Sequence, residues 1–210
     1  MFFSDTTQVI GKASFDFSTA NMDFAVCSGH KIGAPTGVGF IACKDRSQLS
    51  SFIFGGGQEY GLRGGTQNYI GIECLGFAAS LLQKKEELFS EIASLRDAFE
   101  QKITKKFPEL VIFGKDAPRA VNTSFIGHPA VLGSDIQYEL EKHDIFVTTS
   151  SACSDQSASS SKILKAMNVP DNLGQGAVRI SVGFCDPAEV FKTIETALTE
   201  AIVKLTRKAS

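Results

Sequence analysis

Paired cysteines, excess charge and long apolar runs are all missing from this sequence. The formal charge is only −2 and no basic block occurs, so the electrostatic attraction that nucleic-acid binding requires is absent. The longest apolar stretches, such as residues 38–43, are much shorter than a membrane span, and residues 1–5 lack the basic start and apolar run of a signal peptide. We therefore expect no nucleic-acid binding, no membrane insertion and no secretion.

The five cysteines, at positions 27, 43, 74, 153 and 185, are odd in number, lie far apart and form no C-x-x-C pair. Such spacing predicts neither a disulfide framework nor a zinc site. His128 and His143 also follow no ligand spacing, and we expect them at the surface or at helix ends. The pattern predicts no metal site and, because free thiols are typical of reducing compartments, a cytoplasmic location.

The sequence does contain enough apolar material for a packed core. Apolar residues make up 43% of the 210 residues and occur in every segment, which excludes disorder and small disulfide-held scaffolds. This length predicts one large domain or two small ones.

The first part of the chain has the pattern of a sheet followed by a glycine-rich loop. Short extended runs around residues 1–4, 23–27 and 38–43 alternate with turn-like segments, and we expect them to be neighbouring strands. Residues 54–66 hold six glycines in thirteen positions, which predicts a loop with unusual backbone geometry. Residues 68–106 have helical periodicity and are expected to form two helices in tandem, at the hinge between two domains.

Beyond Pro108 strand and helix patterns alternate, as in a small α/β layer. A helix is expected over 135–143, where Ser134 and Gln137 form a capping box, and a final helix is opened by Asp186. We expect strands over residues 111–113, 121–126, 145–149 and 177–182.

The run Ser28-Gly29-His30-Lys31 follows an apolar strand and precedes a tight Gly/Pro turn. A lysine held there in partial desolvation has a lowered pKa and becomes a usable amine nucleophile for Schiff-base chemistry. Ser28 and His30 offer hydrogen-bond donors to an anion such as a phosphate. The alternative interpretation is a polar turn without chemistry.

Asp5 and Gln8 stand at the end of the first expected strand. A buried carboxylate there requires a cation, and a protonated pyridine ring is one such cation. The alternative is an aspartate that opens a surface turn. In Arg63-Gly64-Gly65-Thr66, free backbone N–H groups suit an anion, although Thr66 alternatively caps the helix that follows.

Cys153 lies in residues 150–161, a polar segment in which seven of twelve residues are serine. A thiol in such a segment is accessible, whereas Cys27, Cys43 and Cys74 lie in apolar patterns and are expected in the core. We therefore predict that Cys153 is the reactive cysteine, with Cys185 second.

In chain order, five motifs resemble those of the cysteine desulfurases, which are pyridoxal-phosphate enzymes of the class V aminotransferase family. The motifs are Asp5-x-x-Gln8, Ser28-Gly29-His30-Lys31 with Pro35-x-Gly37, Arg63-Gly64-Gly65-Thr66, Ser151-Ala152-Cys153-Ser154 and Val178-Arg179-Ile180-Ser181. Each motif is weak alone, but their collinear order is specific. Ala34 departs from the family pattern, in which a glycine usually precedes this proline.

The resemblance implies a role for each of these side chains toward pyridoxal 5'-phosphate. Lys31 binds the cofactor covalently, Asp5 pairs with the pyridine nitrogen and Gln8 hydrogen-bonds the ring hydroxyl. By the same resemblance, Ser28 and His30 bind the phosphate, and Thr66 contacts the cofactor of the partner subunit in a homodimer. Arg179 binds the substrate carboxylate, and Cys153 accepts sulfur from L-cysteine.

The resemblance also implies the fold: an α/β chain that is part of a fold-type-I pyridoxal-phosphate transferase. Residues 1–84 resemble the C-terminal part of the large cofactor-binding domain, with a truncated sheet, and residues 85–210 resemble a complete small α/β domain. Family members have a further half before the equivalent of residue 1, with a phosphate-binding turn and a histidine that stacks on the cofactor. We expect an unpaired sheet edge and an uncovered apolar face where that half packs.

The function expected from the resemblance is removal of sulfur from L-cysteine, giving alanine and a persulfide on Cys153 for a sulfur-acceptor protein such as an iron–sulfur scaffold. The missing half is then supplied in the same polypeptide or by a separate chain. One alternative is a non-catalytic remnant or sulfur-carrier module that retains Cys153. A second is a related lyase or aminotransferase of the family acting on another amino acid.

Overall fold

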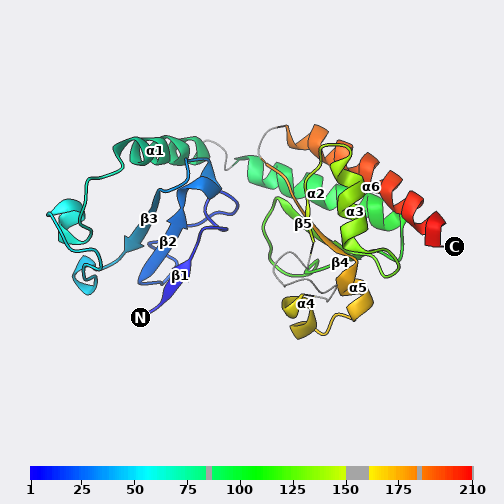
Figure 1. The fold of residues 1–210 in the computed structure, drawn as a ribbon, viewed down its shortest axis with the longest axis horizontal. Helices are drawn as coiled ribbons and strands as arrows, with labels where there is room; N and C mark the ends of the chain where they lie inside the picture. The colour runs from blue at the N-terminus through cyan, green and yellow to red at the C-terminus, as the bar shows by residue number, and fades with distance from the viewer. Residues whose placement is uncertain (84–86, 150–160, 184–185, 210) are drawn as a thin grey trace. The chain divides into compact units, whose positions relative to one another are not determined.

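The computed structural model describes residues 1–83, 87–149, 161–183 and 186–209, and Figure 1 shows their fold. The chain divides into two compact units, which we call unit 1 (Met1–Glu87) and unit 2 (Leu88–Ser210). The sequence predicts a domain boundary after residue 84. Among the described residues, no helix has both the length and the apolar character that a membrane span requires.

Unit 1 contains a three-stranded sheet in the order β1 (Phe3–Asp5), β2 (Phe24–Ser28), β3 (Gly39–Cys43). β1 runs parallel to β2, and β3 is antiparallel to β2 (Figure 1). The apolar side chains of the central strand are mostly buried, which is why the sequence pattern of β2 is the clearest of the three. The predicted strands near 1–4, 23–27 and 38–43 are confirmed.

Four helical segments complete the described part of unit 1. Three are single turns: η1 (Gly29–Ile32), η2 (Arg46–Gln48) and η3 (Gln58–Gly61). The fourth is α1 (Tyr69–Gln83), which contacts η1.

Unit 1 exposes many large apolar side chains. A folded protein seldom leaves so many of them in water without a partner surface. They include Phe2, Phe3, Phe40, Ile41, Phe52, Ile53, Phe54, Tyr60, Tyr69, Ile70, Ile72 and Phe77.

Unit 2 is built on a second, antiparallel sheet with the strand order β4 (Val111–Ile112), β5 (Thr123–Gly127), β7 (Ala177–Ser181), β6 (Thr148–Thr149). β5 and β7 pair along their full length, from Thr123 opposite Ser181 to Gly127 opposite Ala177. The helices are α2 (Glu87–Lys106), α3 (Gly133–Glu141), α4 (Lys162–Ala166), α5 (Asp171–Gln175) and α6 (Pro187–Ala209) (Figure 1).

The core of unit 2 forms where the apolar stripes of α2, α3 and α6 meet the sheet. These stripes recur every three or four residues, as the sequence periodicity predicts. The side chains buried almost completely include Ile92, Phe99 and Ile103 of α2, Ile136 and Leu140 of α3, Leu198 and Ile202 of α6, and Ile126, Val178 and Ile180 of the sheet.

The start of α3 differs from the prediction. Leu132 occupies the N-cap position, and its side chain makes no capping hydrogen bond. A Cβ on Gly133 would lie 2.6 Å from the carbonyl oxygen of Ala177. The first residue of α3 therefore packs directly against the backbone of Ala177, where a side chain would not fit. The capping box of Ser134 and Gln137 is therefore wrong. By contrast, the Asp186 carboxylate accepts a hydrogen bond from the Glu189 N–H at 3.4 Å, as predicted for the start of the last helix.

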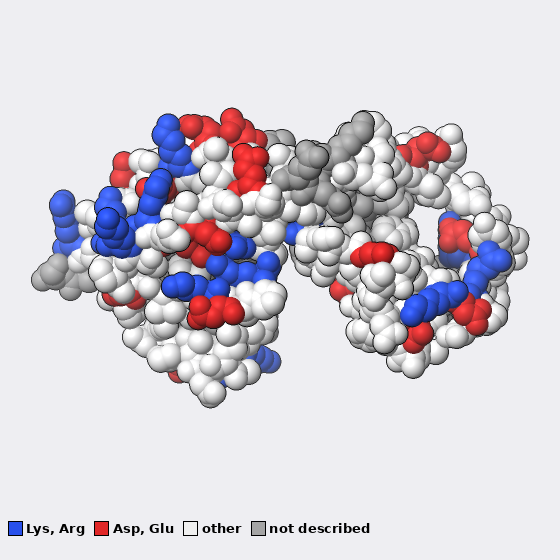
Figure 2. All heavy atoms as spheres, turned by 180° about the vertical axis from the view of Figure 1, so that it is seen from behind, with Lys and Arg blue, Asp and Glu red and all other residues white. Residues whose placement is uncertain are grey.

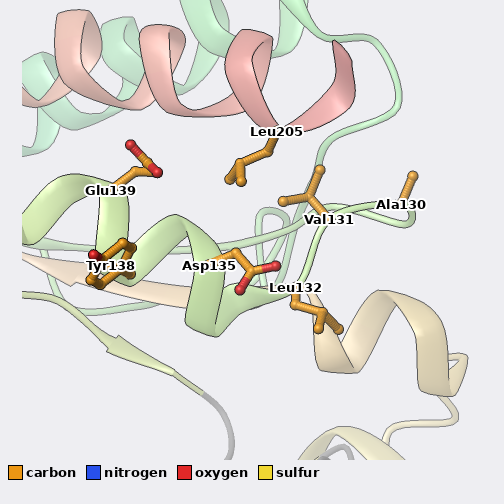
Figure 3. A pocket seen from close by; sticks show the side chains of 7 residues that line it. All are labelled: Ala130, Val131, Leu132, Asp135, Tyr138, Glu139 and Leu205. Atoms are coloured by element: carbon orange, nitrogen blue, oxygen red, sulfur yellow. The ribbon is translucent and has the colours of Figure 1, made fainter. Parts of the chain in front are cut away.

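Glu139 joins α3 to α6. Its carboxylate accepts hydrogen bonds from Lys142 Nζ at 2.8 Å and from Lys204 Nζ of α6 at 2.7 Å. These bonds hold the pKa of Glu139 at about 2, below its usual 4.5. A cavity of about 410 Å³ lies beside the pair, and Figure 3 shows Glu139 and Leu205 pointing into the space between the two helices.

We expect Glu139→Gln to reduce stability near neutral pH and to lose this deficit in acid. Because the folded pKa is lowered, the ionised carboxylate stabilises unit 2 above a pH of about 4.5, and this contribution is lost as the pH falls toward about 2. The measurement is the thermal midpoint of both proteins across this range. Glu141→Gln, on the same helix, is the control. A gap between Glu139→Gln and wild type that does not change with pH would contradict the assignment.

Candidate active site

An open pocket of about 450 Å³ lies where β1 and β2 end and β3 begins. Because β1 and β2 are parallel, with Asp5 opposite Val26, their carboxyl ends share one edge of the sheet. Asp5 and Ser28 line the pocket together, with Thr7 between them. Parallel pairing of two strands thus brings together two predicted site residues that are far apart in sequence.

Ser28 and His30 form a hydrogen-bonded pair beside this pocket. The Ser28 Oγ and the His30 Nδ1 are 2.8 Å apart, and the Ser28 backbone N–H donates to Thr7 Oγ1 at 3.1 Å. The η1 turn reverses the chain directly after Ser28, and Gly33 ends it with a φ of 99°, a conformation that favours glycine. The geometry presents one hydroxyl and one imidazole at a single turn, a set suited to an anion.

The residue of β3 opposite Ser28 must be glycine, because the backbones of β2 and β3 approach each other closely there. Gly39 pairs with Ser28 in the β2–β3 ladder, and a Cβ at Gly39 would lie 2.6 Å from the carbonyl oxygen of Cys27. A Cβ at Gly29 would lie 2.9 Å from the carbonyl oxygen of Val38. These close approaches fix the turn that carries His30 and Lys31.

Lys31 lies in η1 and is exposed, which corrects the expectation of partial desolvation. The physical reason is its position on a turn at the rim of the sheet, where no described element of unit 1 covers it. Asp5 is exposed as well, and its Oδ1 accepts a hydrogen bond from the Thr7 N–H at 2.9 Å. Hydrogen bonds from the side chain and backbone of Thr7 lower the pKa of Asp5, so this carboxylate is ionised and opens a turn.

Lys12 is a site neighbour that the sequence interpretation overlooked. Its Nζ donates a hydrogen bond to Gln8 Oε1 at 2.6 Å. Burial and, second, the charge of Lys31 lower the pKa of Lys12. The contact forms across Gly11, whose φ of 76° is not helical, so the residue spacing carries no signal for it.

Thr66 lies in the glycine-rich loop and is exposed. Arg63 organises this loop: its Nη2 pairs with Glu59 Oε1 at 2.6 Å, and its Nη1 donates to the carbonyl oxygens of residues 64–66. The helix that follows is capped by Asn68, whose Oδ1 accepts from the Gly71 N–H at 3.1 Å. The alternative of Thr66 as a helix cap is therefore wrong.

The other predicted site residues belong to unit 2 or lie outside the described residues. Arg179 is exposed on β7, opposite Phe125 and Thr148. Cys153 and Cys185 lie outside the described residues. Within the described ranges, no cluster of three or more His, Cys, Asp or Glu side chains is arranged to hold a metal ion.

His128 corrects the prediction of a surface histidine, because only 1% of it is exposed. Its Nδ1 accepts a hydrogen bond from the Ala130 N–H at 3.1 Å, and its Nε2 lies 3.3 Å from Glu109 Oε1. Both ring nitrogens thus have structural partners. His143 is exposed, as expected.

Comparison with known proteins identifies the family. The family model for aminotransferase class V matches residues 1–190. The chain belongs to the class V aminotransferase family. It is 33% identical over 196 residues to cysteine desulfurase 2 of Trichormus variabilis, and 34% identical over 206 residues to a cysteine desulfurase of Sinorhizobium fredii. These alignments cover 93% and 98% of this chain but 49% and 53% of the relatives, so the chain spans about half their length.

A solved structure supports the same assignment. A NifS-like protein from Rickettsia africae superposes with a TM-score of 0.82 at 28% identity, over 96% of this chain and 53% of that one. This likeness confirms the predicted α/β fold class, that of part of a fold-type-I class V enzyme.

We expect Gly39→Ala to disrupt the β2–β3 turn, because the new Cβ meets backbone that cannot move away. Overpacking of this kind costs about 1–3 kcal/mol. The measurement is hydrogen exchange of the β2 amides. Gly57→Ala is the matched control, because Gly57 has a φ of −75° and open space around its Cβ position. Equal β2 protection in both variants would show that the close approach at Gly39 does not hold the turn.

Proposed function

We propose that this chain carries the lysine-bearing part of a cysteine desulfurase active site that uses pyridoxal 5'-phosphate. The observation that carries the proposal is the turn of Ser28, His30 and Lys31 at the sheet edge shared with Asp5. Membership in the class V aminotransferase family and the cysteine desulfurase relatives support it. The chain spans about half of those relatives, so catalysis by the whole protein is part of the proposal.

The side chains around the pocket fit the cofactor group by group. The hydroxyl–imidazole pair of Ser28 and His30 suits a phosphate, and the ionised Asp5 suits a protonated pyridine nitrogen. Lys31 stands on the same turn with its amine exposed. When bound, pyridoxal phosphate supplies an aldehyde that condenses with amines and a ring that withdraws electrons from Cα.

Each of these residues then has a defined task. Asp5 holds the ring nitrogen protonated by charge pairing, and Gln8 hydrogen-bonds the ring hydroxyl. The Lys31 amine holds the cofactor in the resting state and moves the substrate Cα proton as a general base. Ser28 and His30 keep the phosphate in place.

Unit 2 supplies the substrate-handling groups in this proposal. Arg179 binds the carboxylate of L-cysteine through two parallel hydrogen bonds. The Cys153 thiolate attacks the substrate sulfur: an S–S bond forms, the Cβ–S bond breaks, and its electron pair takes up a proton to give alanine. The resulting persulfide passes to a sulfur-acceptor protein for iron–sulfur cluster or thio-cofactor synthesis. We propose the cytoplasm as the compartment, because the described thiols of Cys27, Cys43 and Cys74 are free.

We also propose a homodimer in which Thr66 reaches the cofactor of the partner subunit. Phe54 and Tyr60 lie in the loop of Thr66 and Phe52 lies just before it; these aromatic side chains are exposed by 86%, 83% and 93%, which supports a subunit contact there. The apolar surface of unit 1 supports packing against the remainder of the fold, in the same polypeptide or in a separate chain.

A sulfur-carrier module is the second candidate. The observation that favours it is the self-contained core of unit 2, which has its own four-stranded sheet among the described residues. Such a module accepts sulfur on Cys153 from a donor enzyme and needs no cofactor.

We expect Lys31 to capture the cofactor ahead of other lysines. The chain is incubated with less than one equivalent of pyridoxal phosphate and reduced with borohydride, and the labelled peptide is mapped by mass spectrometry. Lys31→Ala should lose the label, and the control Lys44→Ala, at an exposed lysine of the same unit, should keep it. Labelling spread evenly over the lysines would refute the proposed cofactor site.

The sulfur step separates the candidates. When the remainder of the fold, cofactor and L-cysteine are supplied, the wild-type chain should release alanine and carry a persulfide on Cys153, whereas Cys153→Ser should keep the Lys31 label without persulfide. Persulfide taken from a donor enzyme without cofactor, unchanged in Lys31→Ala, would favour the carrier module. Alanine release that persists in Cys153→Ser would favour a related lyase.

A further inference from the structure

Lys12 is a half-buried lysine for which the proposed reaction has no role. Its Nζ lies 2.6 Å from Gln8 Oε1, and its pKa is lowered by burial and by the nearby charge of Lys31. A flexible cation normally turns toward water, so a partly desolvated ammonium held against a neutral amide is unusual.

The backbone fixes this contact. Residues 6–13 form helical turns in which Ile10 N–H donates to the Thr6 carbonyl and Ala13 N–H donates to the Val9 carbonyl, at 3.0 Å each. Within these turns, and across the left-handed Gly11, Lys12 Nζ reaches Gln8 Oε1. Gly11 has a φ of 76°, and its Cβ position lies 2.8 Å from Leu82 of α1, so the segment is also packed against a helix.

The hydrogen bond determines which end of the Gln8 amide is free. Lys12 Nζ carries only donors, so the amide atom facing it is the acceptor Oε1. The Gln8 Nε2 has no hydrogen-bond partner in the described part of the chain, and it remains available as a donor. An amide without Lys12 would turn over freely and present donor and acceptor alike.

We propose that Lys12 is a positioning residue: by holding Gln8 Oε1 it keeps Gln8 Nε2 as the donor toward an oxygen on the ring of bound pyridoxal phosphate. The inference rests on the proposed function, in which Gln8 contacts the ring hydroxyl. Lys12 acts through Gln8 and does not itself touch the cofactor. Its charge also interacts with Lys31 and with Cys27.

The first arm of the test needs no cofactor. In the full chain, the side-chain NH₂ resonances of Gln8 are followed by NMR in wild type, Lys12→Met and Lys12→Arg. We expect Lys12→Met to move the two Gln8 NH₂ resonances toward the chemical shifts of a free amide and to narrow their lines. Lys12→Arg should keep the wild-type chemical shifts. Lys44→Met is the matched control and should leave Gln8 unchanged. The backbone amide spectrum reports whether each variant is folded.

The second arm measures cofactor retention by borohydride trapping on Lys31 at increasing pyridoxal phosphate. Loss of a hydrogen bond to a charged group predicts that Lys12→Met needs about tenfold more cofactor, and that Lys12→Arg restores the wild-type value. Gln8→Ala should show a similar loss, and Lys12→Met should add nothing in the Gln8→Ala background. A lysine with a merely structural role would cost the same in both backgrounds.

The outcomes are separable. A Gln8 amide unaffected by Lys12→Met, or equal costs of that change with and without Gln8, overturns the positioning role while the cofactor site stands. Absence of selective trapping on Lys31 in wild type overturns the proposed function and, with it, this role, even where the first arm finds Gln8 bound to Lys12.

Discussion

The parallel pairing of β1 with β2 is the constraint on which the proposed site depends. It brings the carboxyl ends of two strands to one edge, so that Asp5 and Ser28 share a pocket although they are 23 positions apart in sequence. The antiparallel return of β3 then forces the chain through a tight turn after Ser28. Gly39 permits that return, because any side chain there meets the Cys27 carbonyl oxygen. His30 and Lys31 are positioned by this single helical turn, η1.

Unit 2 is stabilised in a different way, by a conventional core between helices and an antiparallel sheet. The β5–β7 pair is its centre, and α3 and α6 are linked by the ion pair of Glu139 and Lys204. Figure 2 shows acidic and basic side chains interspersed over the visible face of this unit, without a single-sign surface. Arg179 projects from the well-supported strand β7, which suits a residue whose proposed task is to hold a substrate carboxylate in a fixed orientation.

The elements with strong periodicity were predictable, and those decided by tertiary contacts were not. β2 and the apolar stripe of α6 follow their patterns closely, whereas the start of α3 is set by the approach of Gly133 to Ala177, which no local signal reveals. The exposure of Lys31 depends on which surfaces cover η1, and the burial of His128 depends on tertiary contacts, among them the hydrogen bond from its backbone N–H to the Gly176 carbonyl oxygen at 3.2 Å. The contact of Lys12 with Gln8 is not evident from the sequence, because it forms only when the turn between the two residues is folded. Cys153, the clearest chemical candidate in the sequence, lies outside the described residues.

The central claim is that residues 28–33 of this chain form a binding site for pyridoxal phosphate. Its most direct test is a titration of the isotope-labelled chain with the cofactor, followed by NMR of the backbone amides. We expect the largest and saturable shifts on the η1 turn, with smaller ones at Asp5 and Gln8 and none in the core of unit 2. Shifts scattered over exposed lysines, or confined to unit 2, would contradict it.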